Sequence, residues 1–167
     1  MAAEKASSLE DLRRLPAKRM GAGLLLRDDG GRPLLVEPTY KPDWEIPGGI
    51  VELDESPRDC VVREVHEELG IEVAPGPLLV IDYQHVRADR TESLMFVFDG
   101  GVLDERSQAA VTLPADELAS FAFVEPERLA ALTSDRLARR LLRALEATAT
   151  GPCYLENGAA PVDRGRS

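Results

Sequence analysis

The sequence predicts an α/β protein in which one mixed β-sheet lies between α-helices. Two observations carry this prediction: short strand-like runs come in pairs with turn signals between them, and helical stretches with an apolar stripe follow them. The chain has 167 residues, of which 44% are hydrophobic, and this length suits one domain with its own core. We expect an N-terminal helical segment at 1–17, a domain at 18–148, and a disordered tail at 149–167, where Gly, Pro, Ala and charged residues prevail.

The N-terminal part predicts a short helix followed by a hairpin. Ser7 and Glu10 fit a capping box at the start of that helix. Residues 20–26 and 33–37 are apolar strand-like runs, and the Asp-Gly turn at 28–31 lies between them. We therefore expect these two runs to pair with each other.

A helix between Ser56 and Gly70 is the most clearly marked element. Ser56 is a good N-cap, Pro57 suits the first helical position, and Gly70 favours the C-terminal end. Apolar residues recur at helical spacing through Val65 and Leu69, which predicts that one face of this helix packs on the core.

The remaining elements follow from apolar runs and turn signals. Residues 78–86 and 92–99 predict a second hairpin, and 121–124 predict a further short strand. Residues 126–132 and 135–147 predict two helices.

Charge and cysteine content exclude several classes of protein. Asp and Glu number 30 against 20 Lys and Arg, for a formal net charge of −10. This argues against a nucleic-acid partner, which would need a basic surface, but not against a small phosphorylated substrate, because a bound metal ion can supply local positive charge. Cys60 and Cys153 are the only cysteines and are far apart, which excludes a disulfide framework and a cysteine-based zinc site.

The sequence also favours a cytoplasmic protein with no membrane partner. Its first residues include acids and lack the apolar stretch of a secretory signal. The uninterrupted aliphatic runs are far too short to span a bilayer.

Three glutamates on the predicted helix carry the main chemical signal. Glu64, Glu67 and Glu68 are spaced i, i+3 and i+4, which places their Cβ atoms within about 5–6 Å on one face. Like charges at this spacing repel unless a cation lies among them, and oxygen-only ligands favour Mg²⁺ or Mn²⁺. The glycines in Pro47-Gly48-Gly49 leave room for a ligand near the backbone. The alternative is a solvated helix face without function.

The residues around these glutamates decide between the two. The segment resembles the Nudix box, whose pattern is G-x5-E-x7-R-E-U-x-E-E-x-G-U, with U a bulky aliphatic residue. Every fixed position is filled: Gly49, Glu55, Arg63, Glu64, Val65, Glu67, Glu68, Gly70 and Ile71. Nine fixed positions at fixed spacing make this resemblance specific.

The resemblance implies a Nudix fold, with a mixed β-sheet sandwiched between α-helices, and hydrolysis of a nucleoside diphosphate linked to another moiety, assisted by Mg²⁺ or Mn²⁺. It implies that Glu64, Glu67, Glu68 and the backbone of Gly49 hold the metal. Glu64 and Glu67 are also expected to be catalytic. Arg63 would orient the glutamates through ion pairs, and Glu55 would support it.

Four further residues are candidates for substrate contacts. Trp44 can stack on a base or pack on the core. Arg27 and Lys41 flank the expected cleft and can contact phosphates or remain on the surface. Glu117 lies where some members of the family place an extra acidic ligand or base.

Two functions remain open from the sequence. The leading one is a Nudix pyrophosphohydrolase acting on a nucleoside triphosphate, a deoxynucleoside triphosphate, or a nucleotide sugar such as ADP-ribose. The alternative is a catalytically silent Nudix-fold domain that senses a nucleotide, although the retained glutamates favour the enzyme. The habit of the family favours a homodimer.

Overall fold

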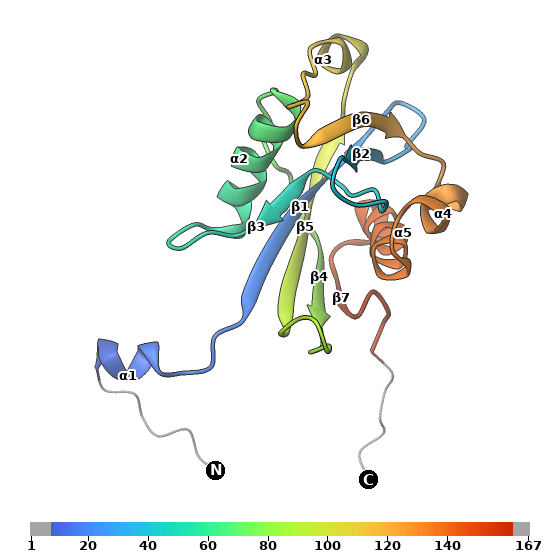
Figure 1. Ribbon diagram of the computed structural model, residues 1–167. Helices are drawn as coiled ribbons and strands as arrows, with labels where there is room; N and C mark the ends of the chain where they lie inside the picture. Colours follow the sequence, from blue (N-terminus) through green and yellow to red (C-terminus); the bar gives the residue numbers. More distant parts are fainter. Residues whose placement is uncertain (1–7, 162–167) are drawn as a thin grey trace.

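A five-stranded mixed sheet forms the centre of the computed structural model, which describes residues 8–161 (Figure 1). Across the sheet, the strands are β3 (Gly48–Ile50), β1 (Arg19–Arg27), β5 (Ser93–Val102), β4 (Leu78–Gln84) and β7 (Cys153–Glu156). The β1–β5 and β4–β7 pairs are parallel, and the other two pairs are antiparallel. The antiparallel pairing of β4 with β5 confirms the predicted second hairpin.

The predicted first hairpin is wrong. Strand β2 (Leu34–Pro38) pairs with β6 (Leu118–Phe123) in a separate two-stranded sheet, and β1 meets the following segment only through a bridge between Arg27 and Pro33. The turn forms as expected, but both edges of β1 are already hydrogen-bonded, to β3 and β5. A strand has only two edges, so β2 must find another partner.

Helix α2 (Pro57–Leu69) is confirmed, with both of its predicted ends. The Ser56 side chain accepts a hydrogen bond from the Asp59 backbone N–H, and Gly70 ends the helix with a φ of 66°. Val61 and Val65 are fully buried in a core with Leu24 and Leu26 of β1. Helix α2 therefore covers one face of the sheet.

A longer helix, α5 (Asp135–Thr150), covers the opposite face. Its residues Leu137 and Leu141 are buried in a second core with Leu25 and Val97 of the sheet. The predicted helix at 126–132 forms as a 3-10 turn (Pro126–Arg128) followed by α4 (Leu129–Leu132), and a short α3 (Glu105–Ala109) was not predicted. A mixed sheet between helices confirms the predicted fold class.

The tail predicted to be disordered contains strand β7, so that prediction is wrong for this part of 149–167; residues 162–167 lie outside the described range. Strand β7 pairs with the free edge of β4, and its Leu155 is fully buried in the second core. An edge strand exposes unpaired N–H and C=O groups, and β7 satisfies them. The burial of Leu155 and the pairing with β4 thus order this segment although its composition is polar.

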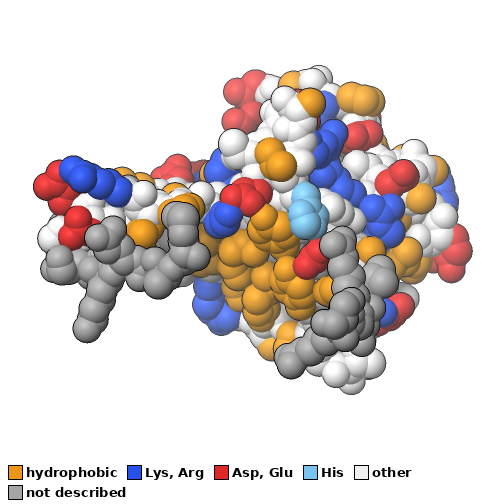
Figure 2. Space-filling model, turned by 90° about the horizontal axis from the view of Figure 1, so that it is seen from below, with side chains coloured by type: hydrophobic (Ala, Val, Ile, Leu, Met, Phe, Trp, Pro, Cys, Tyr) orange, Lys and Arg blue, Asp and Glu red, His pale blue; other side chains and the backbone are white. Residues whose placement is uncertain are grey.

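The N-terminal helix α1 (Leu9–Arg13) stands apart from the sheet (Figure 1). Its capping box is formed by Ser8 and Asp11, one residue later than predicted, and Ser7 lies outside the described residues. Viewed from below, hydrophobic side chains gather in a patch near the centre of the face shown (Figure 2). None of the described helices is both long and apolar enough to cross a membrane.

Candidate active site

Two glycines let strand β3 approach both the sheet and helix α2. A Cβ atom at Gly49 would lie 2.2 Å from Glu64 Oε1, so a side chain there would displace this carboxylate. Gly48 has a φ of 143°, and a Cβ there would lie 2.2 Å from the Ala22 carbonyl oxygen. The sequence thus brings the backbone of β3 directly against a glutamate of α2.

Arg63 connects three of the other predicted site residues. Its Nε and Nη2 donate to the two carboxylate oxygens of Glu55, at 2.8 and 3.0 Å. Its Nη1 donates to Glu64 Oε1 at 2.9 Å and to Glu67 Oε2 at 3.1 Å. A planar guanidinium that binds three carboxylates fixes their relative orientation.

The contact with Arg63 also fixes the charge of Glu55. The hydrogen bonds from Arg63 lower the pKa of Glu55 to about 2, and the same contact raises the pKa of Arg63. Both groups are therefore ionised at neutral pH. Their bidentate ion pair holds the Arg63 side chain in place for its contacts with Glu64 and Glu67.

Glu64 and Glu68 are in the opposite situation, because burial raises the pKa of both. The pKa of Glu68 rises to about 8, although the Gly48 backbone N–H donates to its Oε2 at 3.0 Å. The nearby charges of Glu64, Glu45 and Glu117 raise it further. Burial beside other carboxylates thus disfavours the charged form of both groups, and a nearby cation would favour it again.

This donor set fits a hard divalent cation. No group of three Asp, Glu, His or Cys side chains within residues 8–161 converges on one point, because Glu64 and Glu67 turn toward Arg63. The buried carboxylates of Glu64 and Glu68, however, gain most from a nearby positive charge, which would offset their desolvation. Glu64, Glu67 and Glu68 are the residues that would hold the ion, beside the backbone of Gly49.

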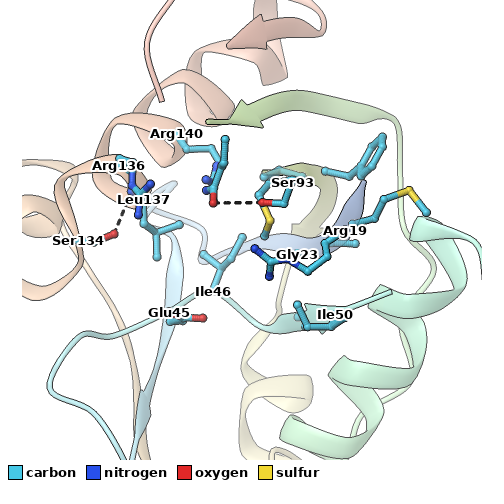
Figure 3. A pocket seen from close by; sticks show the side chains of 18 of the residues that line it. Arg19, Gly23, Glu45, Ile46, Ile50, Ser93, Ser134, Arg136, Leu137 and Arg140 are labelled. Atoms are coloured by element: carbon cyan, nitrogen blue, oxygen red, sulfur yellow. Dashed lines mark hydrogen bonds between the residues drawn. The ribbon is translucent and has the colours of Figure 1, made fainter. Parts of the chain in front are cut away.

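A pocket of about 330 Å³ lies next to this face, between the sheet and the N-terminal end of α5 (Figure 3). Gly48, Gly49 and Ile50 of β3 line it, and Glu64 lies against Gly49, whereas none of the described residues of α2 lines the pocket itself. Lys41 and Glu45 line it as well and form an ion pair with each other. The pocket is large enough to receive part of a nucleotide.

Two of the predicted substrate contacts lie elsewhere. Trp44 is half-buried against the second core, and its backbone N–H donates to the Leu132 carbonyl. Arg27, at the far end of β1, pairs with Asp99 at 2.7 Å. Neither lines the pocket, and both positions fit the structural alternatives that the sequence left open.

The other two candidates lie close to the site. Lys41 lines the pocket, and its ammonium lies 5.4 Å from the centre of the Tyr40 ring. Glu117 is exposed in the loop before β6, and its charge acts on Glu68. Glu117 is thus placed near the glutamate face, and Lys41 near the pocket.

Sequence reasoning missed the arginines that line the pocket: Arg19, Arg90, Arg136 and Arg140. One signal was present. Arg140 stands inside the apolar stripe of α5, between Leu137 and Leu141, and a charge in a buried stripe requires a specific partner. The other three come from segments whose proximity only the fold creates.

Cys60 lies beneath the site and is fully buried. Burial raises the pKa of its thiol to about 12, so it stays protonated and unreactive.

The chain is similar in sequence to a known family and to several curated proteins. A family model described as the NUDIX domain matches residues 17–145. A MutT-like protein of Streptomyces ambofaciens is 31% identical over 125 residues, which cover 75% of each chain. An RNA pyrophosphohydrolase of Pseudomonas putida is 35% identical over 54 residues, covering 32% of this chain and 34% of that relative.

Solved structures share the fold. The MutT protein of Methanosarcina mazei Go1 superimposes with a TM-score of 0.66 at 24% identity, over 81% of this chain and 99% of that one. An ADP-ribose pyrophosphatase of Streptococcus suis gives a TM-score of 0.62 at 22% identity, over 84% and 99%. A UDP-X diphosphatase gives 0.66 at 21% identity, over 84% and 68%.

Proposed function

Since the chain belongs to the NUDIX family, whose members hydrolyse pyrophosphate bonds, we propose that it uses Mg²⁺ or Mn²⁺ to cleave a nucleoside diphosphate linked to another moiety. The observation that carries this proposal is the Arg63 network, because it orients Glu64 and Glu67, and Glu64 lies against Gly49 at the wall of a pocket that can receive part of a nucleotide. We propose residues 18–148 as the hydrolase domain, with β7 added at its edge.

Each charged residue has a role in this proposal. Glu64, Glu67 and Glu68 would hold the ion, which when bound neutralises charge on the phosphoryl oxygens and acidifies a bound water. Arg63, anchored by Glu55, keeps Glu64 and Glu67 at a fixed angle. One of these two carboxylates accepts the proton of the attacking water.

Glu117 and Lys41 have supporting roles in the same proposal. Glu117 adds a negative charge near Glu68 and can serve as a further ligand or base once a substrate brings its own cations. Lys41 can exchange its partner Glu45 for a substrate phosphate, because both lie at the pocket wall.

A substrate screen tests the proposal. Nucleoside triphosphates, deoxynucleoside triphosphates, ADP-ribose and UDP-sugars are incubated with Mg²⁺ or Mn²⁺, and the products are identified by chromatography. We expect a nucleoside monophosphate to be released from at least one of them. Tight binding of a nucleotide without any product would instead favour the sensor domain.

The expectations of a cytoplasmic location and of a homodimer stay predictions. The hydrophobic patch in Figure 2 gives a second copy a surface to cover, and light scattering after size-exclusion chromatography measures the mass directly.

A further inference from the structure

Four arginines from three parts of the chain line the pocket. Arg136 and Arg140 of α5 lie across the pocket from Ile50, and Arg19 of β1 points into the space between them (Figure 3). Arg90, from the β4–β5 hairpin, completes the group. The chain as a whole has a net charge of −10, so its composition does not explain four guanidinium groups around one pocket.

Arg140 is held in place yet retains free donors. It is only 5% exposed, and its Nε donates to Asp82 Oδ2 at 2.8 Å. Its Nη2 lies 2.7 Å from the same oxygen but makes no hydrogen bond to any described residue. The other oxygen of Asp82 accepts a bond from the Gly158 backbone N–H. A buried guanidinium with unused N–H groups at a pocket wall is suited to an anionic ligand.

Two of the neighbouring arginines, Arg19 and Arg136, lack counter-charges, whereas Arg90 lies 3.7 Å from Asp89 Oδ2. Within the described part of the chain, no carboxylate lies within ion-pair distance of Arg136 or Arg19, and Arg19 donates to Thr91 instead. The pKa of Arg136 is lowered by burial and by the charges of Arg87, Arg140 and Arg90. This crowding of like charges is relieved when an anion enters.

We propose that the four arginines bind a phosphomonoester group that the substrate carries in addition to its scissile diphosphate. This inference rests on the proposed function, which places the diphosphate where Gly48 and Gly49 line the same pocket, beside Glu64. A phosphate dianion matches the charge of several cations, and its oxygens fit the fork of a guanidinium group. The extra phosphate can sit on the nucleoside or on the moiety linked to it.

Three substrates distinguish the two positions of the extra phosphate. They are ADP-ribose, ADP-ribose with a 2′-phosphate on the adenosine, and ADP-ribose with a 1″-phosphate on the distal ribose. We expect kcat/KM for one phosphorylated form to exceed that for ADP-ribose by about tenfold or more. Which form is preferred identifies the position of the extra phosphate. Equal kcat/KM for all three would overturn the inference while leaving the hydrolase function intact.

Arg136→Gln tests the residues involved. We expect this variant to reduce the preference ratio, phosphorylated over unphosphorylated substrate, by about tenfold. Arg143→Gln, which removes the same charge from the exposed side of the same helix, should leave the ratio unchanged. A ratio that stays constant in Arg136→Gln, with kcat/KM lowered equally for every substrate, would mean that Arg136 contacts the scissile diphosphate, and the inference would be wrong.

A binding measurement is independent of turnover. Calorimetry compares AMP with adenosine 2′,5′-bisphosphate and adenosine 3′,5′-bisphosphate on the wild-type protein and on Arg136→Gln. We expect one bisphosphate to bind about tenfold more tightly than AMP, and the difference to disappear in the variant. If no substrate is hydrolysed but this difference is present, the proposed function fails and the arginine site stands. If AMP and both bisphosphates bind equally, and ADP-ribose 1″-phosphate binds no more tightly than ADP-ribose in the absence of metal, the arginine site fails.

Discussion

The two ends of the pocket differ in charge and in how that charge is held. Behind Gly49 at the β3 end, carboxylates of α2 lie close together, and a single arginine restrains two of them. At the α5 end, Arg136 and Arg140 lie together, Arg19 and Arg90 line the same pocket, and Asp82 restrains Arg140. The first arrangement is relieved by a cation and the second by an anion. The difference indicates a substrate that joins a metal-bound diphosphate to a further anionic group.

Removal of divalent cations should have the largest effect at the glutamate end. EDTA should abolish turnover, because the clustered carboxylates cannot stabilise negative charge on the phosphoryl oxygens by themselves. Adding Mg²⁺ or Mn²⁺ in excess should restore it, as measured by product release over time. Full activity after exhaustive chelation would show that the glutamates act without a metal.

Leu155→Ala should destabilise strand β7, which pairs with the strand that holds Asp82, the partner of Arg140. Leu155 is fully buried on β7, which pairs with the strand that carries Asp82. Losing its side chain should cost about 2–4 kcal/mol of unfolding free energy, measured by denaturant titration. Tyr154→Ala is the matched control, since that neighbouring side chain is 48% exposed and should have a much smaller effect. Equal effects of the two variants would indicate that β7 does not pack on the core.

These two ends also differ in what the sequence could reveal. The glutamates and Arg63 lie within one helix, so spacing alone places them on a shared face. The arginine end depends on the register of β1 with β5 and on the position of α5, which no local pattern specifies. For the same reason, the sequence predicts the wrong neighbour for β1 and does not reveal the free edge of β4 that orders β7.

The raised pKa of Glu68 predicts a pH dependence of the metal-free protein. The folded state holds its proton up to about pH 8, whereas the unfolded state releases it near the ordinary value of 4.5. The contribution of protonated Glu68 to the unfolding free energy is therefore fully present below pH 4.5 and is lost as the pH rises toward 8. The unfolding free energy should fall across this range. Thermal melts in EDTA measure it, and Glu68→Gln should flatten the curve. A wild-type curve parallel to that of the variant would contradict the assigned shift.

Thiol reagents should have the smallest effect. Cys60 lies beneath the glutamate end, but its buried thiol has a pKa of about 12 and stays protonated. Activity should survive incubation of the native protein with N-ethylmaleimide, measured against an untreated sample. Loss of activity that follows the labelling of Cys60 would mean that the helix opens readily.

The central claim is that one face of α2 performs the chemistry, and steady-state kinetics of four variants at saturating Mg²⁺ test it most directly. Glu64→Gln, Glu67→Gln and Glu68→Gln should each lower kcat by roughly 10²-fold or more, with melting temperatures close to that of the wild type. His66→Ala should change kcat less than about threefold, because this side chain is 60% exposed and points about 100° away from Glu67 on the helix. An inactive His66→Ala beside glutamine variants that retain wild-type kcat would place the active site on another face of the helix and contradict the account.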